Sequence, residues 1–143
     1  MKKTSLKFLS VILFFLVFAG ACTNTYKGFD DCHNTIMLKN SSQSTIYYMS
    51  TLKDGFMNYD PTNPTYAADY KILAGESRKV KIGISLSCWE QVMKSADGYV
   101  YIYIYDAAYL EANPWTDAKN HYLKKYTLNA SQLNKTNWTI TYP

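Results

Sequence analysis

The chain has 143 residues, which is room for one domain and too few for two. Hydrophobic residues make up 48% of it, which excludes a disordered chain. The formal net charge is +4, but three of the 15 basic residues lie within the first seven positions, and the remaining 12 face 11 acidic ones. Because phosphate binding needs a basic field, we do not expect nucleic acid as a partner.

The first segment is typical of an export signal. Residues 1–7 are short and basic, residues 8–18 form an apolar run, and residues 19–21 are the small Ala-Gly-Ala. These are the three regions of a secretory signal peptide. The apolar run is shorter than the about 20 residues that a membrane-spanning helix needs. The sequence therefore predicts a signal peptide over residues 1–21.

Cys22 directly follows that segment. Gly20-Ala21-Cys22 resembles a bacterial lipobox, in which the cysteine thiol is diacylglycerylated before cleavage, although Ala19 stands where the lipobox usually has Leu. The alternative is a secreted protein that begins with an unmodified Cys22, but a cysteine at this point is rare by chance. Lipidation is favoured, and several acyl chains anchor stably because each buried methylene contributes about 0.8 kcal/mol. The polar residues 22–33 are then a lipidated tether to a membrane.

Two further cysteines, Cys32 and Cys88, remain for the exported domain. In an oxidising compartment such a pair most often forms a disulfide. The bridge would close a loop of 57 residues and contribute at most about 4 kcal/mol, stapling the tether to the domain. A metal site formed by these two cysteines with His33 and His121 is the alternative, but the spacing matches no common ligand pattern. We predict the disulfide, no metal and no cofactor.

Residues 34–143 are expected to fold as one strand-rich domain. Apolar and polar residues alternate in seven runs, which marks strands with one buried face. The runs are residues 35–39, 45–50, 69–73, 78–86, 99–105, 122–128 and 138–142. Alternation with solvated faces favours antiparallel sheets. We therefore expect an all-β fold, an antiparallel β-sandwich of the immunoglobulin-like class.

Helical patterns in this region are few and short. One covers residues 89–94, and another covers residues 107–112, with Asp106 as its N-cap and Pro114 as its stop. Residues 129–132 have the spacing of a capping box, with Asn129 in place of Ser or Thr.

Tyrosine is unusually frequent, with 14 residues in the chain. On the strand expected over residues 99–105, four of them share one face: Tyr99, Tyr101, Tyr103 and Tyr105. Such a row on an exposed sheet would stack on sugar rings, with Lys79 and Lys81 of a neighbouring strand as cation–π partners. The favoured alternative is packing, because a central strand covered on both faces carries the same pattern.

A second candidate binding region is the segment of residues 53–67. It has no clear period, and loops of this length are often functional. Phe56, Tyr59 and Tyr66 would recognise a ligand there, or they would form a lid on the end of the sandwich. Both interpretations stay open.

No catalytic constellation stands out in the sequence. The motifs of serine hydrolases, zinc proteases, phosphate-binding loops and dinucleotide-binding folds are missing, and neither His33 nor His121 has a motif around it. The carboxylates are scattered, so nothing selects the pair that a glycosidase needs. We expect a protein that is not an enzyme and keep an exported hydrolase as the weaker alternative.

Several motifs of the C-terminal part of the chain form a recognisable pattern: Trp115-Thr116-Asp117, residues 122–128, Gln132-Leu133-Asn134, the ending Asn137-Trp138-Thr139-Ile140-Thr141-Tyr142-Pro143, and the earlier Asn40-Ser41-Ser42, Ile46-Tyr47-Tyr48 and Tyr105-Asp106-Ala107. Over about residues 40–143 this pattern resembles small uncharacterised outer-membrane lipoproteins of Bacteroidetes-type bacteria. The resemblance implies a β-sandwich lipoprotein of the outer membrane and no particular activity. In such bacteria acidic residues soon after the lipidated cysteine accompany surface display, whereas residues 23–26 are uncharged here.

Together these features predict a lipid-anchored lipoprotein of the cell envelope that acts as a structural or interaction module. Its expected partners are the membrane, through the lipid on Cys22, and an envelope protein or a glycan. The alternative is a surface glycan-binding accessory protein that uses the tyrosine face or the segment of residues 53–67.

Overall fold

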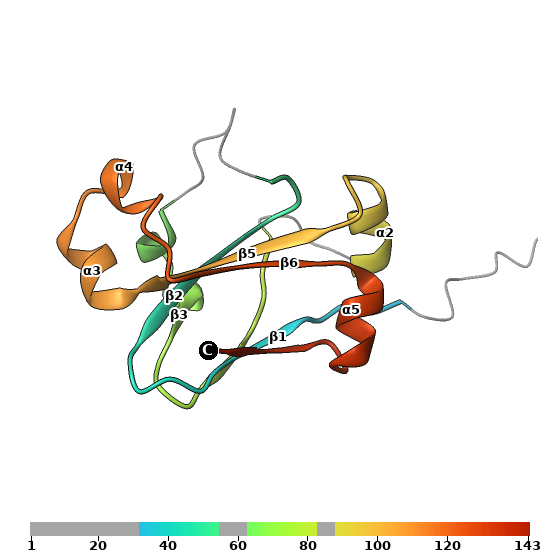
Figure 1. The fold of residues 1–143 in the computed structure, drawn as a ribbon, viewed down its shortest axis with the longest axis horizontal. Helices are drawn as coiled ribbons and strands as arrows, with labels where there is room; N and C mark the ends of the chain where they lie inside the picture. Colours follow the sequence, from blue (N-terminus) through green and yellow to red (C-terminus); the bar gives the residue numbers. More distant parts are fainter. Residues whose placement is uncertain (1–31, 55–62, 83–87) are drawn as a thin grey trace, which may run out of the picture. The chain divides into compact units, whose positions relative to one another are not determined.

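A computed structural model describes residues 32–54, 63–82 and 88–143. The compact unit that holds them runs from Cys32 to Pro143 and consists mostly of strands in two sheets, with a few short helices (Figure 1). The predicted signal peptide, Cys22 and most of the tether lie outside the described residues, as do Phe56 and Tyr59.

The first sheet has three strands in the order β4-β1-β7. Its central strand β1 (Met37–Asn40) pairs antiparallel with β4 (Ser77–Lys79) and parallel with β7 (Thr139–Tyr142). In this register Leu38 lies opposite Arg78 on one side and Ile140 on the other.

The second sheet has four strands in the order β3-β2-β5-β6, and all its pairs are antiparallel. The two central strands, β2 and β5, pair along six residues of β2, with Tyr48 opposite Ile104. The strands are β3 (Lys71–Ile72), β2 (Ile46–Thr51), β5 (Val100–Asp106) and β6 (Lys124–Leu128).

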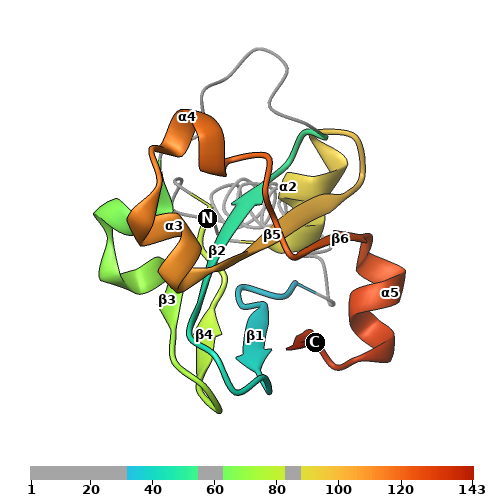
Figure 2. The same ribbon diagram turned by 60° about the vertical axis from the view of Figure 1, so that its left-hand side comes forward.

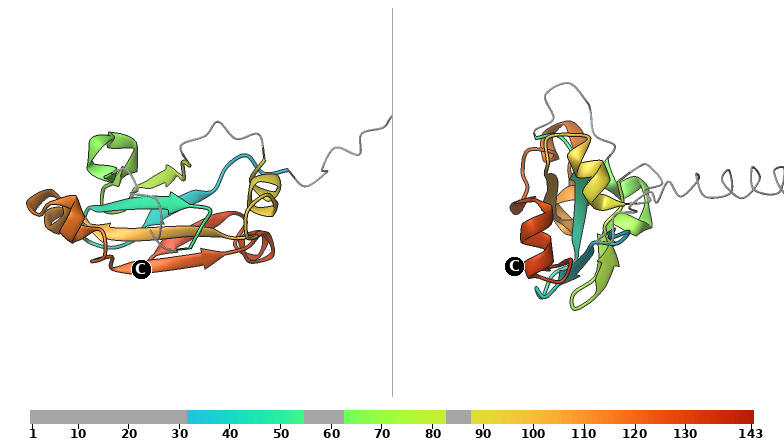
Figure 3. Two further views of the ribbon diagram at one scale, coloured as in Figure 1. Left: turned by 90° about the horizontal axis from the view of Figure 1, so that it is seen from above. Right: turned by 90° about the vertical axis from the view of Figure 1, so that its right-hand side faces the viewer.

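Short helices lie at the two ends of the sheets (Figure 3). Helices α2 (Trp89–Lys94) and α5 (Ala130–Lys135) contact each other at one end, and α3 (Ala107–Ala112) and α4 (Trp115–Ala118) contact each other at the opposite end. Two 3-10 turns, η1 (Pro64–Tyr66) and η2 (Ala68–Tyr70), precede β3.

The predicted helix starts are confirmed. Asp106 accepts a hydrogen bond from the backbone N–H of Tyr109, and Asn129 and Gln132 form the reciprocal bonds of a capping box. Pro114 does not simply end a helix, because it is the N-cap of α4, which the sequence pattern did not predict.

The main core lies between the facing sides of the two sheets, which Figure 2 shows with β1 and β4 apart from β2 and β5. Helices α2 and α5 contribute Trp89, Met93 and Leu133 to it. Tyr48 of β2 joins the sheets by hydrogen bonds, because its hydroxyl donates to the Lys79 carbonyl over 2.9 Å and accepts from the Lys81 N–H over 3.1 Å. The other buried members are Ile36, Leu38, Ile46, Ile72, Val80, Val100, Ile102, Ile104, Trp138 and Ile140.

The prediction of an all-β protein is confirmed at the level of two strand-rich sheets, but the details differ. Strands β1 and β7 run parallel, which the expectation of antiparallel sheets did not include. Alternation identifies the faces of a strand and says nothing about the direction of its partner. Of the strand expected over residues 78–86, the structure forms only the part in β4 among the described residues. The pairing of this segment with β1 ends at the hydrogen bond from Val80 N to the Ile36 carbonyl. Residues 83–87 lie outside the described residues.

One fully buried polar residue, Asn40 at the end of β1, connects the two sheets. Its side-chain amide donates to the carbonyls of Ser44, Ile72 and Leu73 at 2.8, 3.2 and 3.2 Å, and its carbonyl oxygen accepts from Ser42. Its backbone oxygen accepts from Gly75, which has the positive φ of +79° that glycine tolerates best. The side chain of Asn40 therefore ties the end of β1 to the loop before β2 and to the end of β3.

We predict that Asn40→Ala lowers the free energy of unfolding by about 2–3 kcal/mol, because it leaves buried carbonyls without their donor. Urea denaturation of the variant and the wild type measures the difference. The exposed Asn120→Ala is the matched control and should stay within about 0.5 kcal/mol of the wild type. Equal stability of the Asn40 and Asn120 variants would contradict the role of Asn40.

Candidate functional site

The tyrosine face of β5 is the outer side of the second sheet, opposite the core between the sheets. Tyr101, Tyr103 and Tyr105 form a second buried cluster with Tyr47 and Met49 of β2. The helical segment after β5 covers this cluster, and its buried contributions are Ala107, Leu110 and Ala118. Trp115, partly buried, meets the Tyr105 ring edge-on at 5.6 Å between centroids.

The exposed row that sugar stacking requires is not formed. Tyr101, Tyr103 and Tyr105 are 6%, 2% and 1% exposed, and only Tyr99, which precedes β5, reaches 38%. The hypothesis of a sugar-binding face on these four tyrosines is therefore wrong, because three of the rings are buried. The favoured alternative, a central strand that is covered on both faces, describes β5 correctly.

The hydroxyl groups of this face have partners at its edges. The Tyr101 hydroxyl donates to Asp97 over 2.7 Å, the Tyr105 hydroxyl donates to the Lys119 carbonyl over 3.0 Å, and Tyr47 donates to Glu111 over 2.8 Å. These bonds replace the hydrogen bonds to water that the hydroxyl groups lose where they are buried.

Lys125 of β6 is the cation over the tyrosine rings. Its ammonium lies 5.2 Å from the Tyr101 ring centroid and 5.7 Å from that of Tyr103, and it pairs with Asp54. The sequence pattern predicted Lys79 and Lys81 in this place. That prediction is wrong because Lys79 lies in β4 of the first sheet, opposite Met37, and Lys81, two residues after that strand, pairs with Asp69.

The segment of residues 53–67 is described in part. Tyr66, the last residue of η1, is 81% exposed, so it does not act as a lid on the sheets. The turn before it is fixed by Asn63, whose side chain accepts from the N–H of Thr65 over 3.0 Å. Phe56 and Tyr59 fall outside the described residues, and whether they bind a ligand stays a prediction.

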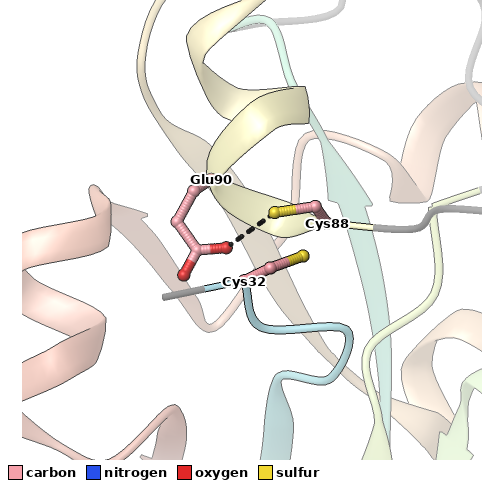
Figure 4. A group of neighbouring side chains, drawn as sticks. All are labelled: Cys32, Cys88 and Glu90. Carbon is pink, nitrogen blue, oxygen red and sulfur yellow. Dashed lines mark hydrogen bonds between the residues drawn. The ribbon is translucent and has the colours of Figure 1, made fainter. Parts of the chain in front are cut away.

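The structure places Cys32 and Cys88 together with Glu90, which the sequence analysis did not single out (Figure 4). Cys88 is the buried N-cap residue of α2, Glu90 lies in the first turn of that helix, and the exposed Cys32 precedes β1. The two Sγ atoms and a carboxylate oxygen of Glu90 all lie within 4.8 Å of one another. The Cys88 thiol donates to Glu90 Oε2 over 3.3 Å.

His33 positions the Glu90 carboxylate. Its backbone N–H donates to Oε2 over 2.9 Å, and its ring Nδ1 lies 2.5 Å from Oε1. The ring itself stacks on Trp138, with centroids 4.2 Å apart and an interplanar angle of 13°. Partial burial raises the pKa of Glu90, but the hydrogen bonds that its carboxylate accepts, from His33 and also from Cys88 and the backbone, together hold that pKa below the usual value.

Both cysteines are thiols in the structure. A disulfide needs an S–S distance of about 2.05 Å, so the bond stays a prediction although the structure brings its two partners together. A hydrogen bond with Cys88 raises the pKa of the Cys32 thiol to about 11. His121 of the alternative metal set is not part of this group, since its ring lies 5.4 Å from that of Tyr109.

Sequence reasoning missed Glu90 because it compared only the spacings of cysteine and histidine. The available signal was the position of Glu90 in the first turn of the helix predicted over residues 89–94, two residues after Cys88.

Comparisons of the chain with protein-family models, with curated proteins and with solved structures found no match. Among the described residues, no helix has the length and hydrophobicity needed to cross a membrane.

The tyrosine face gives a prediction about pH. The hydrogen bond to Asp97 raises the pKa of Tyr101 to about 12, above its ordinary value of about 10. The contribution of neutral Tyr101 to the free energy of unfolding is therefore complete below about pH 10. This contribution is lost as the pH rises through about 12. Asp97→Asn should return the pKa of Tyr101 toward about 10, because it removes the acceptor charge.

The measurement is an NMR titration of protein with labelled tyrosine rings, in which Tyr101→Phe assigns the signal. Asp117→Asn, at an exposed carboxylate in α4, is the control and should leave the titration unchanged. An unchanged Tyr101 pKa in Asp97→Asn would show that the Asp97 bond does not set it.

Proposed function

We propose that this protein is a lipid-anchored lipoprotein of the outer membrane that acts as a structural or interaction module and not as an enzyme. The observation that carries the proposal is Cys22 directly after the small residues 19–21, which follow a short basic segment and an apolar run. The strand-rich unit begins at Cys32, so about ten residues separate the lipid from the fold. The resemblance of residues 40–143 to outer-membrane lipoproteins supports the location.

The contacts at the start of the fold suit an anchored protein. The His33 carbonyl accepts from Trp89 N over 2.8 Å, and the His33 side chain contacts Glu90 and Trp138. Force on the tether would therefore pass into α2 and the core before it reaches β1. A disulfide between Cys32 and Cys88, which we propose for the oxidised protein, would add a covalent bond at the same place.

Several carboxylates of the described residues are paired with other side chains of the fold, which fits an interaction role and not catalysis. Glu111 binds Lys71 and Tyr47, Glu90 binds His33, and Asp69 binds Lys81. Each of these carboxylates already has a partner in the fold, which a substrate would have to displace. For the architecture, we propose an immunoglobulin-like sandwich, which the two sheets and their shared core support.

Glycan binding remains a second candidate, now limited to the segment of residues 53–67. Tyr66 supports it, because an aromatic ring that is 81% exposed is available for stacking on a sugar. The tyrosine face of β5 no longer supports it.

The anchor is tested by Cys22→Ser in the native host, followed by separation of outer membrane, inner membrane and periplasm. The wild type should be found in the outer membrane, and Cys22→Ser should leave that fraction, because the thiol that carries the lipid is gone. Cys32→Ser is the matched control and should stay in the outer membrane. Full retention of Cys22→Ser in the outer membrane would contradict the proposal.

A further inference from the structure

The side chains of Cys32, Cys88 and Glu90 bring two sulfurs and a carboxylate oxygen together where the tether meets the fold (Figure 4). We propose that, while both thiols are reduced, these three residues bind a divalent transition-metal ion of the Zn²⁺ class. This inference goes beyond the proposed function and does not depend on the lipid anchor.

The donor set has the chemistry that zinc prefers. Cysteine thiolates and a carboxylate are common zinc ligands, and soft sulfur donors disfavour Mg²⁺ and Ca²⁺. With Zn–S about 2.3 Å and Zn–O about 2.0–2.2 Å, tetrahedral ligand atoms lie about 3.6–3.8 Å apart. The present atoms lie within 4.8 Å of one another, so any two ligand atoms need to approach each other by about 1.2 Å at most. Cys32 is exposed and leaves a path by which the ion can enter.

The carboxylate is already oriented by a second layer of contacts. The backbone N–H and the ring of His33 hold the two oxygens of Glu90, and Trp138 holds the ring of His33 by stacking. Metal-binding side chains in proteins are commonly fixed by such partners, whose loss typically lowers metal affinity about 10- to 100-fold. With three protein ligands, the fourth position of a tetrahedral ion is left to water.

The same sulfurs cannot hold the metal and form a disulfide. A bond between Cys32 and Cys88 would remove two of the three ligands, so metal binding belongs to the reduced protein alone. The disulfide form of the same chain is therefore a control that needs no further substitution.

The experiment uses the full chain in a Cys22→Ser background, purified in detergent, so that Cys32 and Cys88 are its only thiols. The reduced protein is dialysed against Zn²⁺ alone, and bound metal is measured by elemental analysis. We expect one Zn²⁺ per chain, and with Co²⁺ a near-ultraviolet sulfur-to-metal charge-transfer band. The disulfide form, identified by an intact mass lower by about 2 Da for two hydrogens, should bind no metal.

Glu90→Gln should weaken Zn²⁺ binding by about tenfold or more, because it replaces a charged ligand with a neutral amide. Glu76→Gln is the matched control, since Glu76 lies directly before β4, where it pairs with Arg78 at 3.8 Å. This variant should bind Zn²⁺ like the parent. Circular dichroism of each variant establishes that it is folded.

Three results would overturn the site. They are no Zn²⁺ bound by the reduced protein, equal Zn²⁺ binding by the reduced and disulfide forms, and equal affinity of the Glu90→Gln and Glu76→Gln variants. None of them bears on whether Cys22 carries a lipid.

Discussion

Strand β5 is buried along both of its faces, and the fold must therefore supply a covering layer on each side of it. From Val100 to Tyr105 every residue is buried. The aliphatic side faces the core shared with the first sheet, and the tyrosine side is covered by the segment that forms α3 and α4. Hydrogen-bond partners at the edge of the cluster are required as well, since buried hydroxyl groups need partners. Asp97 and the Lys119 carbonyl supply two of them.

The sequence pattern predicted the parts of the fold that depend on local chemistry. Period-two alternation identified β5, and the side chains of Asp106 and Asn129 marked two helix starts where the structure has them. The sequence pattern could not show what covers a strand. Alternation distinguishes the two faces of a strand, but it does not tell whether solvent or protein covers each face. The tyrosine row was consequently open to two interpretations until the burial of Tyr103 and Tyr105 separated them.

Features that depend on distant parts of the chain were missed for a related reason. The parallel pairing of β1 with β7 joins residues about 100 positions apart. The placement of Lys125 over Tyr101 and Tyr103 depends on β6 being the neighbour of β5. Glu90 joins the two cysteines because the segment before β1 is held against the start of α2. The sequence predicted only that Cys32 and Cys88 would lie together, from the predicted export and the even number of cysteines after the predicted anchor, and their disulfide stays a prediction.

The start of the fold and the predicted anchor are close in sequence, which gives the region around Cys32 two roles. It is the first part of the unit after the tether, and it holds the one group of possible metal ligands found among the described residues. His33 contributes to both roles: its ring attaches the start of the unit to the core by stacking on Trp138, and it orients Glu90 in the group of possible metal ligands. A chemical change at Cys32 and Cys88, by oxidation or by metal binding, would thus alter the connection between tether and domain.

We propose that Cys22 is the lipidated first residue of the mature protein. Trypsin digestion of protein extracted from membranes, followed by mass spectrometry, tests it directly, since the first peptide would run from Cys22 to Lys27. We predict that this peptide begins at Cys22 and carries the added mass of a diacylglyceryl group. A first peptide with an unmodified Cys22, or one that retains residues from 1–21, would contradict the proposed lipid anchor.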